Sequence, residues 1–383
     1  MKLLKVAERA AVPPFHVMDV VSAASARQRL RGDVVSLAAG QPSTGAPSAV
    51  RVAAAEAIGS GPLGYTEQVG ILELREAIAG HYLRRSGVEV SAADVIVTTG
   101  SSGGFLLAFL AAFDAGDRVA LARPGYPAYR NILTALGCEV VELPCGPDTR
   151  FQPTVAMLEE AGPLDGVIVA SPANPTGTVL DPGELAAIAG WCAERGAQLV
   201  SDEIYHGISY GSQTASAWQF SREAVVVNSF SKYFGMTGWR LGWLLAPSRL
   251  HRAIDCLTGN FHLCAPTVSQ HAAVAAFEPE TYAELDTHVT RYRTNRDVLL
   301  AGLAELGITE VAPADGAFYA YADVSHLTHD AMSFCQRLLA DTGLAIVPGI
   351  DFDPVDGHRS VRLSFAGSTE DVREALRRLG GWL

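Results

Sequence analysis

The sequence predicts an α/β fold in which a mostly parallel sheet is covered by helices on both faces. Between about residue 95 and residue 246, short β-branched and apolar runs alternate with longer segments of helical periodicity. The apolar runs are continuous rather than alternating, which is typical of strands buried on both faces. Ligands of such sheets bind beyond the carboxyl ends of the strands, so polar residues at those positions are the first candidates for function.

The first 250 residues supply most of the predicted strands and helices. Strands are expected at Asp33–Leu37, Val95–Thr99, Arg118–Ala122, Glu139–Leu143, Gly166–Ala170, Gln198–Ser201, Val225–Val227 and Gly242–Ala246, the last a candidate antiparallel strand. Helices are expected at Val17–Leu30, Pro47–Ile58, Leu72–Ile78, Phe105–Phe113, Tyr129–Leu136, Val155–Glu160 and Pro182–Arg195.

The C-terminal third predicts a smaller α+β domain. One or two long helices cover Thr267 to Leu306. Short strands and helices then alternate at Ala317–Tyr321, Ala331–Thr342, Ala345–Val347, Ser360–Phe365 and Thr369–Leu379. The chain is too long for one compact core, and we expect three parts: residues 1–45 as an arm joined to the small domain, 46–275 as the large domain, and 276–383 as the small domain.

The composition narrows the class of function. A hydrophobic share of 49% with 18% charged residues is typical of a globular protein. The formal net charge of −12 argues against nucleic-acid and anionic-membrane partners, which select for basic surfaces. No signal segment is indicated at Met1–Glu8, and the six cysteines lack CxxC spacing. We therefore expect a cytoplasmic enzyme with reduced thiols and no metal site.

One lysine stands out as a candidate for chemistry. The chain has three lysines, Lys2, Lys5 and Lys232. Lys232 follows the apolar run Val225–Val227, and Arg240 comes eight residues later. An ammonium near a buried strand end is costly to desolvate, so its pKa falls and the amine becomes able to form a Schiff base.

A glycine- and serine-rich turn is the candidate anion site. Gly100-Ser101-Ser102-Gly103 lies between the predicted strand Val95–Thr99 and the predicted helix Phe105–Phe113. Free amides and the dipole at a helix N-terminus both favour an anion. Such a turn on its own is more often only a turn, and it matches neither the Walker loop nor the dinucleotide GxGxxG pattern.

Three further polar residues have both a structural and a functional interpretation. Asn174 lies between two prolines after the predicted strand Gly166–Ala170, and Asp202 follows the next strand. Asp202 is either a loop or helix cap or a functional carboxylate. Arg362, inside a predicted strand, is a solvated edge residue or a carboxylate-binding fork. Together with Lys232 and the anion turn, these residues are what pyridoxal phosphate requires: an amine, an anion site and a carboxylate for the ring nitrogen.

Several motifs in order resemble the class I aminotransferases of the fold-type I pyridoxal-phosphate superfamily, in the prokaryotic aspartate-aminotransferase-like branch. They cover nearly the whole chain: Leu-Ala-Ala-Gly-Gln-Pro (37–42), Gly-Tyr-Thr (64–66), Ser-Pro-Ala-Asn-Pro-Thr-Gly (171–177), Asp-Glu-Ile-Tyr (202–205), Ser-Phe-Ser-Lys followed by Met-Thr-Gly-Trp-Arg-Leu-Gly-Trp (229–243), and Val-Arg-Leu-Ser-Phe-Ala (361–366). The resemblance implies a large domain with a seven-stranded, mostly parallel sheet, a smaller α+β domain and pyridoxal 5′-phosphate as cofactor.

The resemblance also implies the catalytic residues, which are Lys232, Asp202 and Tyr205. Lys232 would bond to the cofactor as a Schiff base and later shuttle a proton. Asp202 would keep the ring nitrogen protonated. Asn174 and Tyr205 would hydrogen-bond the phenolic oxygen, and Tyr126 would stack on the ring.

The remaining implied contacts concern the phosphate and the substrate. The phosphate would be held by Ser101, Ser102, Gly103, Ser229 and Arg240. Tyr65 would reach it from the neighbouring subunit, so the resemblance implies a homodimer with shared active sites. Arg362 would clamp the substrate α-carboxylate, helped by Asn174 and the Gly40 amide.

One departure from the family pattern bears on the substrate. Aspartate-specific members of this branch carry a lysine in a Gly-Gly-Lys turn, and Ser102 stands at that position here. This difference favours small or aliphatic amino acids, and the text around Cys256–Phe261 resembles actinobacterial alanine/valine–pyruvate aminotransferases.

Other activities stay open from the sequence. They are an aspartate–2-oxoglutarate aminotransferase and a C–S β-lyase, which shares Lys232, Asp202 and Arg362. A regulatory module on the same fold is disfavoured, because the acidic chain carries no DNA-binding segment ahead of the enzyme-like part.

Overall fold

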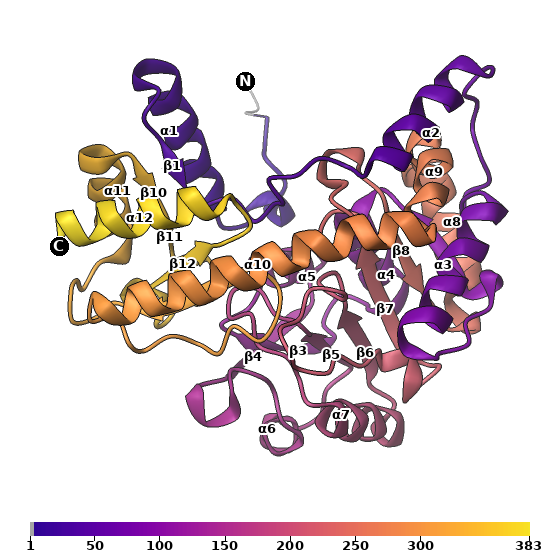
Figure 1. The fold of residues 1–383 in the computed structure, drawn as a ribbon. Coiled ribbons are helices and arrows are strands. Elements are labelled where there is room, and N and C mark those ends of the chain that lie inside the picture. The colour runs from indigo at the N-terminus through magenta and orange to yellow at the C-terminus, as the bar shows by residue number, and fades with distance from the viewer. Residues whose placement is uncertain (1–3) are drawn as a thin grey trace.

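A computed structural model describes residues 4–383 and has the predicted α/β architecture (Figure 1). Its central sheet has seven strands in the order β2-β8-β7-β6-β5-β3-β4. These strands are β2 (Val95–Thr98), β8 (Gly242–Leu245), β7 (Val225–Ser229), β6 (Gln198–Asp202), β5 (Gly166–Ala170), β3 (Arg118–Arg123) and β4 (Glu139–Pro144). Residues 1–3, which include Lys2, lie outside the described part of the chain.

The sheet is parallel except at one strand. β8 is antiparallel to both of its neighbours, β2 and β7, as predicted for Gly242–Ala246. The other adjacent pairs are parallel. The strands β2, β6, β7 and β8 are buried along their whole length, because helices cover both faces of the sheet. The continuous apolar runs in the sequence therefore correspond to strands that are buried on both faces, as predicted.

The helices of the large layer surround this sheet (Figure 1). They are α2 (Ser48–Gly59), α3 (Leu72–Ser86), α4 (Gly100–Ala112), α5 (Pro127–Leu136), α6 (Val155–Ala161), α7 (Pro182–Arg195), α8 (Ser248–Phe261) and α9 (Thr267–Val274). Helix α8 was not predicted from the sequence. Its apolar residues Leu250 and Ile254 are buried one helical turn apart and belong to the same core as α4, and this spacing is the signal that could have revealed the helix.

α4 begins earlier than predicted. The sequence predicted a helix over Phe105–Phe113 preceded by a turn, whereas the glycines and serines form the first turn of the helix itself. The cause is close packing against β8. A Cβ on Gly104 would lie 3.2 Å from the Leu244 side chain, and one on Gly242 would lie 2.9 Å from the Ser101 amide nitrogen. Only residues without side chains let the helix N-terminus approach the sheet this closely.

The C-terminal part forms a separate small layer together with the N-terminal segment. β9 (Tyr319–Asp323), β12 (Ser360–Ser364) and β11 (Val347–Pro348) make a three-stranded antiparallel sheet. β1 (Val35–Ser36) pairs in parallel with β10 (Leu344–Ala345), which ties the N-terminal segment to the C-terminal part. The flanking helices are α1 (His16–Arg31), α11 (Ala331–Thr342) and α12 (Thr369–Trp382).

One long helix links the two parts. α10 (Pro279–Glu305) runs across the molecule from the α9 side to the α12 side (Figure 1). Its Asn295 side chain donates to the carbonyl oxygens of Phe365 and Gly367. The division at residues 45/46 and 275/276 stays a prediction, because one large apolar cluster runs through both parts.

Two kinds of feature are absent from residues 4–383, the part of the chain that the structure describes. No helix there is long and apolar enough to cross a membrane. No group of three or more His, Cys, Asp or Glu side chains there could hold a metal ion.

Candidate active site

Lys232 lies three residues beyond the end of β7 at the carboxyl edge of the sheet. Its chain neighbours are buried, with Phe230 fully enclosed. The Lys232 side chain itself is half-buried, and its Nζ donates to the Gly40 carbonyl oxygen at 2.6 Å. The pKa of the Lys232 amine is lowered to about 8, first by desolvation and then by the positive charge of Arg362. An appreciable fraction of this amine is therefore neutral and nucleophilic near neutral pH.

Asp202 ends the neighbouring strand β6 and faces the same edge. It lies in register with Ala170 of β5 and Val227 of β7. Its Oδ1 accepts from the Ile204 amide at 3.0 Å, and its Oδ2 accepts from the Tyr129 hydroxyl. Burial raises the pKa of Asp202 to about 6, while the Tyr129 and Ile204 hydrogen bonds and Lys232 oppose that rise. Above that pH the site holds a buried carboxylate that can pair with a cationic ring nitrogen.

The N-terminus of α4 and Arg240 lie against each other and form the candidate anion-binding end of the site. Arg240 has a left-handed backbone (φ 52°), and its Nη1 donates to the neutral carbonyl oxygen of Thr237 at 3.0 Å. A Cβ on Gly100 would lie 2.7 Å from Arg240 Nη2, so the guanidinium sits directly against the first turn of the helix. Helix amides and an arginine that converge in this way are suited to bind a phosphate.

The residues predicted to bind the phosphate differ in whether their donor groups are already bonded within the protein. Ser229 Oγ lies 2.9 Å from Ser231 Oγ and 3.2 Å from the Leu241 carbonyl oxygen, so the single proton of this hydroxyl is already used within the protein. Ser101 is half-buried and Ser102 is exposed in the first turn of α4, while Gly103 is buried. The first backbone amides of α4 have no helical partner and are free to donate to an anion, whereas the Ser229 hydroxyl is bonded within the protein.

Arg362 forms the second cationic group, inside β12 of the small layer. It is 2% exposed, which excludes the solvated-edge interpretation. Nη1 donates to Asn174 Oδ1 at 2.9 Å and Nη2 donates to the Ala38 carbonyl oxygen at 2.8 Å. Both partners are neutral, and Nε has no hydrogen-bond partner among the described residues. A buried cation with neutral partners and a free donor is suited to bind a carboxylate.

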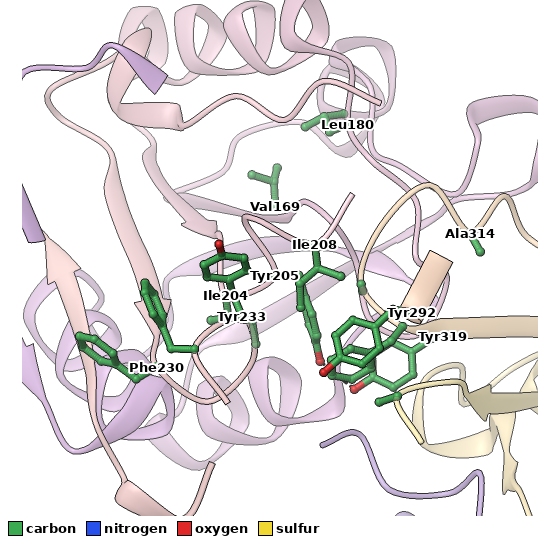
Figure 2. Packing of buried hydrophobic residues seen from close by; sticks show 14 of the residues in the cluster. Val169, Leu180, Ile204, Tyr205, Ile208, Phe230, Tyr233, Tyr292, Ala314 and Tyr319 are labelled. Atoms are coloured by element: carbon green, nitrogen blue, oxygen red, sulfur yellow. Dashed lines mark hydrogen bonds between the residues drawn. The ribbon is translucent and has the colours of Figure 1, made fainter. Parts of the chain in front are cut away.

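The aromatic residues close the site around these groups. Tyr205 is 2% exposed, and its ring centre lies 5.5 Å from Lys232 Nζ. Its hydroxyl lies 2.7 Å from that of Tyr319. Tyr126 sits at the start of α5, edge-on to Phe15 and to Tyr129 with ring centres 6.2 Å and 5.3 Å away. Figure 2 shows Tyr205 and Tyr319 in adjoining positions within the buried cluster.

One predicted residue lies apart from this cluster. Tyr65 stands on the segment between α2 and α3 and is 83% exposed. That segment lies on the side of the molecule far from the small layer (Figure 1). The other predicted residues come together from β6, β7, β12, α4, α5 and the loops that follow the strands.

The sequence analysis missed two residues of this cluster, Tyr129 and Tyr319. Tyr129 was assigned only to a helix, and Tyr319 only to a strand. The sequence around each of these tyrosines is typical of a core position in a helix or strand, and both side chains are buried. The Tyr-Pro-x-Tyr spacing at 126–129, which puts two tyrosines one helical turn apart, was the available signal for Tyr129.

The donor set fits pyridoxal phosphate. An amine, a buried carboxylate at the end of the neighbouring strand, two hydroxyl or amide donors and an anion cradle match the aldehyde, ring nitrogen, phenolic oxygen and phosphate of that group. The anion cradle has no room for side chains at its two glycines. A Cβ on Gly100 would clash with the Arg240 guanidinium, and a Cβ on Gly242 would clash with the Ser101 amide nitrogen.

Comparisons with known proteins agree with this chemistry. The family model described as aminotransferase class I and II matches residues 32–379. The chain is 64% identical over 382 residues to a valine–pyruvate aminotransferase of Mycobacterium tuberculosis, covering 99% of this chain and 98% of that protein. It is 35% identical over 373 residues to an aspartate/prephenate aminotransferase of Thermus thermophilus, covering 96% of each.

Solved structures give the same result for the fold. The crystal structure of an aminotransferase from Mycobacterium tuberculosis superposes with a TM-score of 0.98 at 64% identity, covering 100% of this chain and 99% of the other. Thermus thermophilus aspartate aminotransferase with maleate gives a TM-score of 0.94 at 33% identity and covers 100% of both chains. The chain therefore belongs to the class I and II aminotransferases, a family of pyridoxal-phosphate-dependent enzymes of fold type I.

Proposed function

We propose that this aminotransferase moves the α-amino group between small or aliphatic L-amino acids, valine and alanine foremost, and pyruvate. The observation that carries the proposal is the buried Arg362, whose two protein partners are neutral and whose Nε is free for a substrate α-carboxylate. The 64% identical relative that is named as a valine–pyruvate aminotransferase supports the choice of substrates.

The catalytic roles are proposed as follows. Bound pyridoxal phosphate supplies an electron sink for the pair left when the substrate Cα–H bond breaks. Lys232 would hold the cofactor through its amine, and once substrate displaces that amine it would accept the proton from the substrate Cα. Asp202 keeps the ring nitrogen protonated. Asn174 and Tyr205 donate to the phenolic oxygen, and Tyr126 covers one face of the ring.

The binding roles use the anion sites at the two ends. Ser229, Arg240 and the amides of the α4 first turn (Ser101, Ser102, Gly103) hold the phosphate. Arg362, with Asn174 and the Gly40 amide, holds the α-carboxylate. The aromatic surroundings of Arg362 include Tyr319 and Phe352, whose ring centres lie 4.5 Å and 4.7 Å from its Cζ.

The side-chain pocket is proposed to be apolar. Ser102 stands where aspartate-specific members carry a lysine. It is exposed and carries no charge that could pair with a second substrate carboxylate. Phe15 places an apolar edge beside Tyr126. These residues provide no cation for a second carboxylate on the substrate. Burying that carboxylate unpaired would cost on the order of several kcal/mol.

We infer that the enzyme is a homodimer with shared active sites. Arg240 borders a cavity of about 670 Å³ that is lined also by Gln41, Thr237 and Ser269. Arg240 is exposed in the single chain, and so is Tyr65. A second copy that places its Tyr65 at the phosphate end would close this side.

We also place the reaction in the cytoplasm, supported by six free cysteines, four of which are buried.

A donor panel tests the substrate proposal. L-valine, L-alanine, L-aspartate and L-cysteine would each be incubated with holoenzyme and with pyruvate, 2-oxoisovalerate or 2-oxoglutarate. We expect stoichiometric amino transfer with valine and alanine and a kcat/KM for aspartate lower by about 100-fold or more. Faster transfer from aspartate to 2-oxoglutarate would replace the proposal by the aspartate activity. Release of pyruvate and ammonia from cysteine without transfer would replace it by the β-lyase activity.

A further inference from the structure

Tyr319 lies between the two halves of the site and touches both. It is the first residue of β9 in the small layer and is 1% exposed. Its hydroxyl lies 2.7 Å from the Tyr205 hydroxyl of the large layer. Its ring face carries the guanidinium of Arg362, with Cζ 4.5 Å from the ring centre. The close-up in Figure 2 shows Tyr205 and Tyr319 as neighbours.

The hydrogen bond between the two tyrosine hydroxyls has a fixed donor and acceptor when Tyr205 donates to a ligand. Each phenol has one proton to donate, and either oxygen of this pair can be the donor. If Tyr205 gives its proton to a ligand oxygen, the bond between the two tyrosines requires Tyr319 as the donor. A phenol that accepts one hydrogen bond donates a stronger one. The Tyr319 hydroxyl therefore both orients Tyr205 and strengthens it as a donor.

The ring of Tyr319 restricts Arg362. The guanidinium packs against the rings of Tyr319 and Phe352, whose centres lie 4.5 Å and 4.7 Å from Cζ. Its edges are held by the Asn174 side chain and the Ala38 carbonyl oxygen. The two ring contacts and the two hydrogen bonds restrict the orientation of the guanidinium plane, which a bidentate carboxylate contact requires.

The same hydroxyl determines what can stand at Gly40. A Cβ on Gly40 would lie 2.1 Å from the Tyr319 hydroxyl oxygen. The Gly40 carbonyl oxygen accepts from Lys232 Nζ. Tyr319 thus also packs against the segment that holds the amine of Lys232.

We propose that Tyr319 is a positioning residue with two separable parts: its hydroxyl sets Tyr205 for the cofactor, and its ring sets Arg362 for the substrate carboxylate. The inference rests on the proposed function, in which Tyr205 contacts the cofactor and Arg362 contacts the substrate. The two parts make different predictions, because Tyr319→Phe removes only the hydroxyl and Tyr319→Leu removes the ring as well.

The test measures two properties of the holoenzyme variants. The first is the pH midpoint of the visible absorption of the bound cofactor. The second is kcat and KM for the amino donor, measured separately. A weakened Tyr205 donor stabilises the deprotonated chromophore less, so in Tyr319→Phe we expect the midpoint to rise by about half a pH unit or more, with KM within about twofold of wild type. In Tyr319→Leu we expect the same rise together with a KM about tenfold higher.

The matched control is Tyr321→Phe. Tyr321 is two residues further along β9 and is likewise buried, but its ring neighbour is Phe352 at 6.4 Å. We expect neither the midpoint nor KM to move in this variant. A Tyr319→Phe midpoint equal to that of wild type, or equal shifts in Tyr319→Phe and Tyr321→Phe, would overturn the inference for the hydroxyl. If Tyr319→Leu does not fold, Tyr319→Phe still decides it.

The outcomes separate this inference from the proposed function. A wild-type protein that binds no pyridoxal phosphate, or transfers no amino group, contradicts the proposed function whatever Tyr319 does. A wild type that is coloured and active, with a Tyr319→Phe variant of unchanged midpoint, contradicts only the role of Tyr319. An unchanged KM in a folded Tyr319→Leu variant contradicts the part assigned to the ring.

Discussion

The amine of Lys232 donates to the carbonyl oxygen of Gly40 at 2.6 Å, across 192 residues of the chain. Gly40 follows β1, whose strand partner β10 belongs to the C-terminal part. The contact therefore fastens the end of β7 in the large layer to the small layer at the point where chemistry is proposed. A half-buried ammonium needs such an acceptor when no ligand is present.

Lys232→Ala should abolish amino transfer, with kcat/KM lower by about 10⁴-fold or more, because the covalent attachment and the proton carrier are lost together. Borohydride reduction of wild-type holoenzyme followed by peptide mass spectrometry should place the cofactor on Lys232. The control is Lys5→Ala, an exposed lysine near the N-terminus, which should keep both label and activity. Label found elsewhere would show that the amine has been wrongly assigned.

Arg362→Lys should raise KM for the amino donor by roughly 100-fold, equivalent to about 3 kcal/mol, since a point-like ammonium cannot replace the planar fork. The cofactor spectrum should stay close to wild type. Arg359→Lys is the matched control. Its partner is Asp323 at 3.2 Å, and its side chain is half-exposed, so we expect less than about a twofold change. Equal effects of the two substitutions would argue against carboxylate binding by Arg362.

Gly40→Ala should reduce activity by about 10-fold or more, because the new Cβ strikes the Tyr319 hydroxyl and displaces the Lys232 acceptor. Adding Tyr319→Phe removes that oxygen, and the nearest remaining ring atom is 3.1 Å away. Gly40→Ala should then cost less in the Tyr319→Phe background than in wild type, which a double-mutant cycle measures. Gly45→Ala, with no atom within 4 Å of its Cβ, is the control. Additive effects would mean that the contact is not responsible.

Glu203→Gln should change how stability depends on pH. Glu203 is fully buried, and its Oε1 accepts from Ser201, Ser216 and the Ala217 amide. Burial raises its pKa from 4.5 to about 8. The folded protein therefore holds a proton that the unfolded chain has released, and stability falls as pH rises from about 4.5 to about 8.

The glutamine variant lacks that fall, since it does not titrate. Relative to wild type it should gain stability on the order of a few kcal/mol between pH 5 and pH 8.5, seen as a diverging thermal midpoint. His206, whose Nδ1 lies 3.4 Å from Glu203 Oε2, has its pKa lowered to about 4 by burial and is common to both proteins. Glu374→Gln is the control, because the pKa of that surface carboxylate is lowered to about 2. Parallel wild-type and Glu203→Gln curves would contradict the prediction.

Subunit hybrids should test the shared active site. Tyr65→Ala and Lys232→Ala are each expected to be poorly active alone at limiting cofactor. After mixing and reassociation, hybrid dimers contain one site with an intact Lys232 and a Tyr65 from the other chain, so activity should recover to about a quarter of wild type. Lys232→Ala mixed with the double variant Lys232→Ala/Tyr65→Ala is the control and should gain nothing. Failure of the first mixture to recover, with hybrids present, would argue against Tyr65 acting across the interface.

Local patterns in the sequence determined the sheet and the polar groups at its edge. Lys232, Asp202 and the glycine-serine turn each follow an apolar strand directly, and the carboxyl ends of parallel strands meet at one edge. The position of Arg362 within a strand was also readable, although its burial was not, because the same alternation fits an exposed edge and a buried site.

Only the tertiary structure decided which side chains support these groups. Tyr129 meets Asp202 across 73 residues, and Tyr319 meets Tyr205 across 114 residues and Gly40 over a longer span. Each of these tyrosines looks like an ordinary core residue in its own helix or strand. Their function depends on long-range packing that joins the large and small layers, and no local spacing encodes which hydroxyl a buried ring will reach.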